Sequence, residues 1–228
     1  MLTEGLKKRV GAAFVGHRGR LFEALGGNAR LHEWLRANQP FPSFADRFQL
    51  YEYIQSEVLK GQPIDYLEFG VSRGVSFLRW AEINSHQESR LFGFDTFEGL
   101  PEPWVSVSAV APTGAYSTKG VVPETGDHRV QFVIGLFNAT LRPFLEHFQP
   151  RSRLVIHNDS DLFSSTLYML VTLDPILVPG SILIFDEFAN PMHEWRAFSD
   201  YVAAFGRSFR VLGASGAYYT QVALEVTA

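Results

Sequence analysis

Short apolar runs alternate with segments of helical spacing along most of the chain. Five runs of strand length lie at 64–69, 90–94, 129–134, 153–157 and 181–185. Two final runs, 209–212 and 219–226, are separated by a short segment that contains Gly213 and Gly216. Alternating strands and helices predict an α/β fold, with a mostly parallel sheet and helices on both faces. The short final connection predicts a closing hairpin, which adds one antiparallel strand.

Two segments fall outside this alternation. Residues 1–43 combine helical spacing with scattered basic residues, and they predict a helical appendage whose basic face is solvated. A substrate cap or an oligomer contact is the alternative for this segment. Residues 96–128 are rich in proline and glycine, and connections of this length are usually functional lids or disordered. Trp104 and Tyr116 within 96–128 favour a lid over the main domain, which we place at 44–228.

Composition excludes several classes of protein. The chain has 228 residues, of which 46% are hydrophobic and 19% charged, as in an ordinary globular protein. A net charge of -4 disfavours nucleic acid as a partner, and the absence of cysteine excludes disulfides and thiolate zinc sites. No apolar run is long enough for a membrane span, and no signal-peptide pattern follows the basic N-terminus. We therefore expect a soluble cytoplasmic protein without a membrane partner.

Acidic residues or glycine follow the predicted parallel strands. In chain order these residues are Glu68, Asp95, Gly135, Asp159 with Asp161, and Asp186 with Glu187. Ligands of open parallel sheets bind at the carboxyl ends of the strands, so these residues are expected to share one site. Any single acid here can serve as a helix cap, but neighbouring carboxylates repel by about 4 kcal/mol per pair at ~4 Å. The set as a whole therefore predicts a functional site.

The first predicted strand leads into a glycine pattern, Glu68-Phe-Gly70-Val-Ser-Arg-Gly74. This pattern is G-x-x-x-G, whereas G-x-G-x-x-G is the pattern that brings the backbone against a pyrophosphate, so a nicotinamide dehydrogenase is disfavoured. An acid at the strand end also repels phosphate. A cationic cofactor without phosphates, such as S-adenosylmethionine, fits better. Asp95 ends the next strand, where a carboxylate can accept the hydroxyls of a ribose.

Four motifs carry a family resemblance. They are Tyr-Leu-Glu-Phe-Gly-Val-Ser-Arg-Gly at 66–74, Gly-Phe-Asp-Thr-Phe-Glu-Gly-Leu-Pro-Glu at 93–102, His-Asn-Asp-Ser-Asp-Leu-Phe-Ser-Ser-Thr at 157–166 and Phe-Asp-Glu-Phe at 185–188. Together they resemble the macrocin O-methyltransferase-like class of S-adenosylmethionine-dependent methyltransferases over about residues 44–226. The resemblance implies a Rossmann-like class I methyltransferase fold, with a seven-stranded sheet whose last strand is antiparallel. Relatives in this class act on sugar hydroxyls of macrolides and aminocoumarins.

The resemblance also implies a metal site. It places Mg²⁺ on Asp159, Asp186 and Glu187, and it makes Asp161 the general base. This chain has Asp-Glu where relatives have Asp-Asp, a departure that falls on the third ligand. Carboxylates without cysteine suit Mg²⁺ or Mn²⁺ better than zinc. A metal of this kind lowers the pKa of a hydroxyl that it binds.

Further candidate residues flank the motifs. Besides Glu68, Asp95 and Asp159, we expect cofactor contacts from Gly70, Arg73, Gly74, Ser76, Thr96, Phe97, Gly135 and Phe137. His193 either faces the acceptor as a second catalytic residue or lies exposed on a helix predicted to start at Asn190 and Pro191. His157 is a ligand or base on one interpretation, and a histidine held structurally at the end of a buried strand on the other.

The sequence therefore predicts a Mg²⁺-dependent O-methyltransferase acting on a hydroxyl of a sugar or a natural-product small molecule. A metal-independent small-molecule methyltransferase and a catalytically degenerate binding module remain as alternatives. Assembly into a homo-oligomer is also open, with Trp34 and Phe41 as candidate contact residues. The identity of the acceptor is left undetermined.

Overall fold

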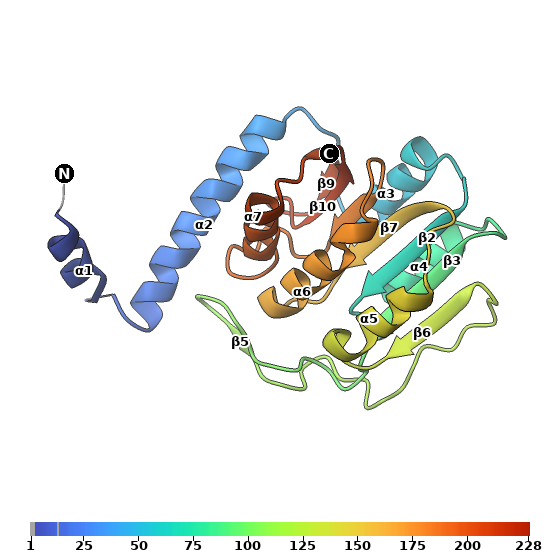
Figure 1. The fold of residues 1–228 in the computed structure, drawn as a ribbon, viewed down its shortest axis with the longest axis horizontal. Coiled ribbons are helices and arrows are strands. Elements are labelled where there is room, and N and C mark those ends of the chain that lie inside the picture. The colour runs from blue at the N-terminus through green and yellow to red at the C-terminus, as the bar shows by residue number, and fades with distance from the viewer. Residues whose placement is uncertain (1–2, 13) are drawn as a thin grey trace.

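A computed structural model describes residues 3–12 and 14–228, and its centre is a sheet of eight strands (Figure 1). Along the sheet the order is β1-β9-β10-β8-β7-β2-β3-β6. The strands are β1 (Ser43–Phe44), β2 (Ile64–Phe69), β3 (Arg90–Asp95), β6 (Val130–Ile134), β7 (Arg153–Asn158), β8 (Ile182–Phe185), β9 (Phe209–Ser215) and β10 (Gln221–Val226). All neighbours pair in parallel except β10, which is antiparallel to both β8 and β9. The predicted mostly parallel sheet with an antiparallel last strand is confirmed, and the short β1 adds an eighth strand.

Helices cover both faces of the sheet, as predicted. On one face lie α3 (Arg47–Tyr53), which continues as a π-helical turn (Ile54–Val58), and α4 (Val75–Ile83). On the other face lie α5 (Phe137–His147), α6 (Phe163–Leu173) and α7 (Glu194–Phe205). A short 3₁₀ turn (Asp174–Ile176) follows α6. Alternation along the strands supplies the two cores: on β2, Tyr66 packs toward α4, and its neighbour Leu67 packs into the opposite core.

Local hydrogen bonds explain where the helices that frame the site begin. The Asp46 side chain accepts the backbone N–H groups of Phe48 and Gln49, and so caps the start of α3. The prediction that a helix starts at Asn190 and Pro191 is wrong, because α7 begins only at Glu194. Asn190 caps a tight turn instead, since its side-chain oxygen accepts the N–H of Met192.

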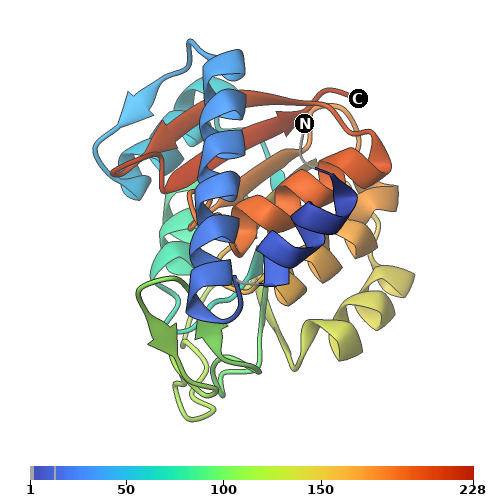
Figure 2. The ribbon, with the colours of Figure 1, turned by 90° about the vertical axis from the view of Figure 1, so that its left-hand side faces the viewer.

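The N-terminal segment forms α1 (Glu4–Ala12) and α2 (His17–Asn38), and α2 lies beside α7 (Figures 1 and 2). Leu31 and Leu35 of α2 are buried in the core. Trp34 packs against Phe188 and Trp195, with ring centroids 5.4 and 5.6 Å away. The second half of α2 therefore belongs to the packed body of the protein. Residues 1, 2 and 13 of the predicted appendage lie outside the described residues.

The two residues proposed for an oligomer contact both pack within the chain. Trp34 lies on the core as described, and the ring of Phe41 meets that of Tyr219 at 5.5 Å between centroids. Both side chains are partly buried by contacts within the chain, and assembly stays a prediction. No described helix is long and apolar enough to cross a membrane.

The segment 96–128 runs along the open edge of the molecule and includes a small hairpin of β4 (Trp104–Val105) and β5 (Val110–Ala111). Gly99, at a positive φ of 85°, lies close to the backbone of Gly114 and Ala115, so two parts of the segment 96–128 come together here. A Cβ at Gly99 would lie 2.3 Å from the carbonyl oxygen of Ala115. This close approach requires glycine.

Candidate active site

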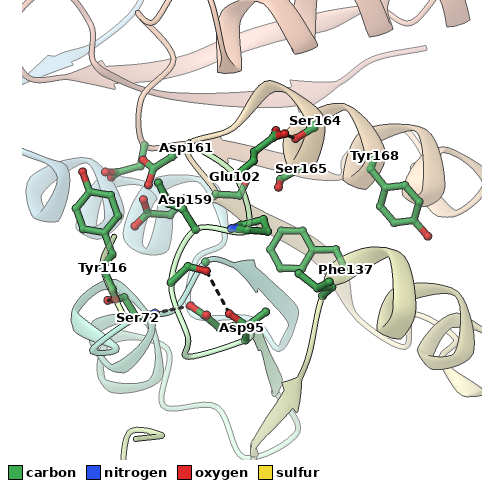
Figure 3. A pocket seen from close by; sticks show the side chains of 18 of the residues that line it. Ser72, Asp95, Glu102, Tyr116, Phe137, Asp159, Asp161, Ser164, Ser165 and Tyr168 are labelled. Carbon is green, nitrogen blue, oxygen red and sulfur yellow. Dashed lines mark hydrogen bonds between the residues drawn. The ribbon is translucent and has the colours of Figure 1, made fainter. Parts of the chain in front are cut away.

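A cavity of about 710 Å³ lies at the carboxyl ends of the central strands, where the strand order reverses between β2 and β7 (Figure 3). Ligands of open α/β sheets bind at this point, outside the carboxyl ends of the strands. Eight of the residues predicted from sequence line the cavity. They are Gly70, Asp95, Thr96, Phe137, Asp159, Asp161, Asp186 and Glu187. The sheet therefore brings the acids and the glycine loop together as the strand ends predict.

Gly70 allows two strand ends to touch. Its φ is +92°, and a Cβ there would lie 1.9 Å from the carbonyl oxygen of Asp159, so no side chain fits. Backbone bonds tie the same region together: the N–H of Gly70 donates to Phe94, and the N–H of Asp159 donates to Phe69. The loop after β2 and the loop after β7 are therefore fixed against each other.

Asp95 is held rigidly at one end of the cavity. Its Oδ2 accepts the backbone N–H groups of Val71 and Ser72, each at 2.7 Å, and its Oδ1 accepts that of Phe97 at 2.7 Å. Figure 3 shows the bond between Ser72 and Asp95. Ser72 and Phe97 adopt positive φ angles of 47° and 59°. Left-handed backbone at non-glycine residues is strained, and such strain gathers at functional sites. The glycine loop and Asp95 thus form one unit facing the cavity.

Asp159 and Asp161 at the other end lack such donors. Among the described residues, no hydrogen bond reaches either carboxylate. Burial and then the charges of Asp186, Glu68 and Asp161 raise the pKa of Asp159 well above its usual range. Burial, followed by the charges of Glu187 and Asp186, raises the pKa of Asp161 to about 7. This end of the cavity therefore holds more negative charge than its protein partners compensate.

The backbone and a neighbouring acid add to this picture. Asp161 has a positive φ of 61°, so this functional candidate is itself a strained position. Burial also raises the pKa of Glu187, although a hydrogen bond with Asn190 lowers it. Figure 3 shows Asp159 and Asp161 beside Tyr116 of the segment 96–128. The prediction that this segment reaches the site is consistent with Tyr116, Gly99, Leu100, Pro101 and Glu102 lining the cavity.

Arg47 is the cationic residue that sequence reasoning missed. One guanidinium nitrogen lies 3.1 Å from each carboxylate oxygen of Asp186 and also lines the cavity. No sequence motif marks Arg47, because α3 reaches the site only through tertiary packing. Within residues 3–12 and 14–228, no three acidic or histidine side chains are gathered closely enough to form a ready metal site.

Glu68 lies behind the cavity, fully buried in a polar network. Its Oε1 accepts the hydroxyl of Ser76 at 2.8 Å, and its Oε2 meets the hydroxyl of Tyr66 and, at 3.2 Å, Nδ1 of His157. Tyr51 contacts the other ring nitrogen of His157 at 3.3 Å. Glu68 and Ser76 thus do not line the cavity. His157 is held in place by the side chains of Glu68, Tyr66 and Tyr51, which agrees with the structural interpretation of this histidine.

His193 fastens the segment 96–128 to α6. Its Nδ1 accepts the N–H of Phe163 at 3.2 Å, and its Nε2 donates to the carbonyl of Val105 at 3.0 Å. The ring stacks on Trp104 at 5.3 Å and 13°. Burial lowers the pKa of His193, which favours this neutral form. Because both ring nitrogens are engaged outside the cavity, this placement does not support the predicted catalytic role, and the alternative of an exposed histidine is wrong.

The remaining predicted cofactor residues support the loops from outside the cavity. Arg73 is exposed, Gly74 caps α4, Phe97 is buried in the core and Gly135 precedes the lining residues Leu136 to Asn138. Conversely, Ser72, Glu102, Ser164, Ser165 and Tyr168 line the cavity without having been predicted. The Ser/Thr-rich start of α6 was the available signal for Ser164 and Ser165. The hydroxyl of Ser164 donates to Glu102 and so links α6 to the segment 96–128.

Comparison with known proteins identifies the family. A family model described as a methyltransferase domain matches residues 67–188, more than half of the chain. The chain belongs to this methyltransferase family. The family predicted from the sequence motifs is thereby confirmed, and the matched range covers the strand ends that build the cavity.

The chain is also similar to one curated relative and to two solved structures. A sequence match from Streptomyces olivaceus, 8-demethyl-8-(2,3-dimethoxy-alpha-L-rhamnosyl)-tetracenomycin-C 4'-O-methyltransferase, is 32% identical over 167 residues. The match covers 63% of this chain and 62% of that relative. Among solved structures, calicheamicin methyltransferase CalS11 has a TM-score of 0.60 at 23% identity, covering 88% of this chain and 91% of its own. The O-methyltransferase NovP has a TM-score of 0.59 at 21% identity, with 80% of each chain covered. These two structures share the fold.

Proposed function

We propose that this protein is an S-adenosylmethionine-dependent O-methyltransferase that methylates a hydroxyl of a sugar or of a sugar-bearing natural product. The observation that carries the proposal is the two-ended cavity, with Asp95 fixed at one end and the unpaired carboxylates of Asp159 and Asp161 at the other. The tetracenomycin relative, whose name specifies a 4'-O-methyltransferase of a rhamnosyl group, supports the acceptor class.

The Asp95 end is proposed to hold the cofactor. Gly70, Asp95, Thr96 and Phe137 line it, and the fixed Asp95 carboxylate keeps lone pairs directed into the cavity. An acid-lined cavity suits the positive sulfonium and ammonium groups of S-adenosylmethionine and disfavours a phosphate-bearing cofactor. When bound, this cofactor supplies the methyl group. Glu68, Arg73, Gly74, Ser76, Phe97 and Gly135 support this end from outside the cavity, so their direct contact with the cofactor stays a prediction.

The acidic end is proposed to hold Mg²⁺ or Mn²⁺ through Asp159, Asp186 and Glu187. The all-oxygen donor set fits a hard divalent cation. Burial and then the charges of Asp186, Glu68 and Asp161 raise the pKa of Asp159, whereas Arg47 lowers it, so a bound cation would relieve this repulsion. A metal at this position would lower the pKa of an acceptor hydroxyl.

Asp161 is proposed as the general base. It faces the cavity from a strained backbone position and lies two residues from Asp159. In the transfer, Asp161 takes the proton of the acceptor hydroxyl, whose oxygen forms a bond to the methyl carbon. The bond from that carbon to sulfur breaks, and its electron pair stays on sulfur. The products are the methyl ether and S-adenosylhomocysteine, and a protonated Asp161 returns its proton to solvent.

One observation favours a metal-independent methyltransferase as the second candidate. Arg47 already supplies a positive charge to both oxygens of Asp186. If Arg47 is the resident cation, it polarises the acceptor without a metal, and the acids serve the cofactor and the base alone. A degenerate binding module remains the third possibility, and it requires neither methyl transfer nor a base at Asp161.

Methyl transfer to a rhamnosylated polyketide and to free deoxysugars, followed by mass spectrometry, tests the proposal. We expect one added methyl group, strict dependence on S-adenosylmethionine, and loss of transfer after metal removal with EDTA that added Mg²⁺ restores. Full transfer in EDTA would select the metal-independent candidate. Binding of S-adenosylhomocysteine without transfer to any glycoside would favour the binding module. The division at residue 43 and any homo-oligomer also stay predictions, which truncation and sedimentation test.

A further inference from the structure

Glu194, the first residue of α7, is a fully buried carboxylate next to the acidic end of the cavity. Its Oε1 accepts the side-chain N–H of Asn158 at 2.7 Å, and its Oε2 accepts the backbone N–H of Glu187 at 2.9 Å. These two donors come from different strand ends, since Asn158 ends β7 and Glu187 follows β8. Glu194 therefore bridges the two turns that carry the acids.

The contacts continue on the side of β7. The hydroxyl of Ser160 donates to Oδ1 of Asn158 at 2.8 Å, and Nδ2 of Asn158 donates to the hydroxyl of Thr166 at 3.1 Å. Ser160 and Thr166 also meet each other, at 3.2 Å between hydroxyl oxygens. Asn158 and Ser160 flank Asp159 in the chain, so this buried network fixes the backbone on both sides of that acid.

We infer that Glu194 is a positioning residue, which holds the acidic turn after β8 in register with the acidic turn after β7. The inference rests on the proposed function, because it assigns Glu194 a role through Asp159, Asp186 and Glu187. Residues that orient metal-binding carboxylates typically change metal affinity or activity by 10–100-fold when they are replaced.

A simple role in capping α7 does not explain these contacts. A capping carboxylate accepts N–H groups from the first turn of its own helix, and it can do so from an exposed position. Glu194 instead accepts one donor from a loop and one from another strand end, at complete burial. Burying a carboxylate is costly unless it is well hydrogen-bonded. The two hydrogen bonds of Glu194 offset part of that cost, and both come from the acidic turns.

Glu194→Gln removes one acceptor while preserving size. The new amide keeps one oxygen, so one of the two donors at Asn158 and Glu187 is left facing an N–H group. By isothermal titration of the metal-free protein, we expect Mn²⁺ affinity to fall at least about tenfold. S-adenosylhomocysteine affinity should stay within about twofold, since Asp95 and the glycine loop are untouched. Glu146→Gln, the same change at an exposed position on α5, is the matched control and should alter neither affinity.

A double variant separates geometry from overall destabilisation. Combining Asn158→Asp with Glu194→Gln exchanges the two groups, so that the carboxylate stands at position 158 and the amide at position 194. The amide at 194 then donates to the carboxylate at 158, and its oxygen accepts the N–H of Glu187. The hydroxyl of Ser160 still donates to position 158, and the hydroxyl of Thr166, which accepted from Nδ2 of Asn158, rotates to donate to the new carboxylate. We expect this pair to recover most of the Mn²⁺ affinity that Glu194→Gln alone loses.

Three results would overturn the inference. Mn²⁺ affinity could stay unchanged in Glu194→Gln, both affinities could fall equally as in partial unfolding, or the double variant could fail to recover. A wild-type protein that binds no Mn²⁺ would contradict the metal part of the proposed function instead. In that case, kcat and KM for the acceptor decide: a fall in kcat with KM and cofactor affinity retained supports positioning, and no change in kcat overturns it.

Discussion

At one end of the cavity Asp95 accepts three backbone N–H groups, whereas at the other end Asp159 and Asp161 accept no hydrogen bond from the described residues. Both ends are built from aspartates that follow buried strands of the same sheet. Asp95 is surrounded by its own loop and by the glycine loop. Asp159 and Asp161 face a space bounded by other acids and by Arg47, which is bound to Asp186.

The difference concerns what each carboxylate still needs. Asp95 is fixed by the protein and requires no outside partner to stay in place. At the acidic end, burial and neighbouring acids disfavour the charged forms of Asp159 and Asp161 and raise the pKa of both. A bound cation or a bound proton relieves this repulsion. A site that must bind a ligand and then move a proton needs both kinds of carboxylate: one for position and one for reactivity.

The largest effect is expected from Asp161→Asn. Removing the general base should lower kcat by about 10²–10⁴-fold, the usual contribution of acid–base catalysis. Titration of S-adenosylhomocysteine should show unchanged affinity, because the Asp95 end is intact. Asp200→Asn on the exposed face of α7 is the control. If Asp161→Asn retains full kcat, Asp161 is not the general base, and the proposed roles of the two ends of the cavity are contradicted.

Asp95→Asn should act on the opposite end. The amide retains one oxygen, so at least one of the N–H groups of Val71, Ser72 and Phe97 loses its acceptor. Leaving such a donor unsatisfied costs about 1–3 kcal/mol. We expect S-adenosylhomocysteine affinity to fall about tenfold, the equivalent of about 1.4 kcal/mol. Mn²⁺ affinity measured in the same titrations should not change, and an equal loss of both would show that the ends are not separable.

Arg47→Gln asks whether the resident cation competes with a metal. Asp186 is then free of the guanidinium, so we expect Mn²⁺ to bind roughly threefold more tightly, a modest gain because this ion pair is partly exposed. Arg79→Gln removes two ion pairs, with Glu52 and Glu82, outside the residues that line the cavity, and it should leave Mn²⁺ binding as it is. Loss of methyl transfer with unchanged Mn²⁺ affinity would favour the metal-independent candidate.

The smallest effect concerns a satisfied carboxylate outside the cavity. A hydrogen bond from Arg207 lowers the pKa of Asp174, despite partial burial, and Tyr201 adds another. A lowered pKa stabilises the folded state above the unfolded value of about 3.9, and this contribution is lost as pH falls through the folded pKa. Asp174→Asn should therefore reduce the free energy of unfolding by on the order of 1 kcal/mol at neutral pH.

Denaturant unfolding at several pH values checks that sign. The difference between wild type and Asp174→Asn should shrink as pH falls below about 4, where the carboxyl of the unfolded chain becomes protonated, and disappear below the lowered pKa of the folded carboxyl. A difference that is constant with pH would show that Asp174 stabilises by shape alone. Asp174, whose hydrogen bonds lower its pKa, would then no longer be a valid contrast to Asp161, whose pKa is raised.

The sequence by itself determined seven of the eight strands of the sheet. It also determined that five of them run in parallel and that acids lie at their carboxyl ends. Hydrophobic periodicity reports which residues are buried, and the handedness of strand–helix–strand units leaves few topologies. Local patterns were weaker at turns. Asn190 and Pro191 carry a helix-start signal, yet Asn190 closes a turn and α7 starts at Glu194.

Only the tertiary structure decided which side chains face the cavity and which lie behind it. Glu68 is the last residue but one of β2 and Asp159 follows β7, but the pleat turns Glu68 toward Tyr66 and His157 in the core below α4. Arg47 reaches Asp186 across 139 positions of the chain, and Glu194 reaches Asn158 across 36, by packing that no local pattern encodes. Sequence spacing specifies where a strand ends. The environment of a carboxylate at that end depends on the helices that pack against it in the tertiary structure, such as α3 and α7.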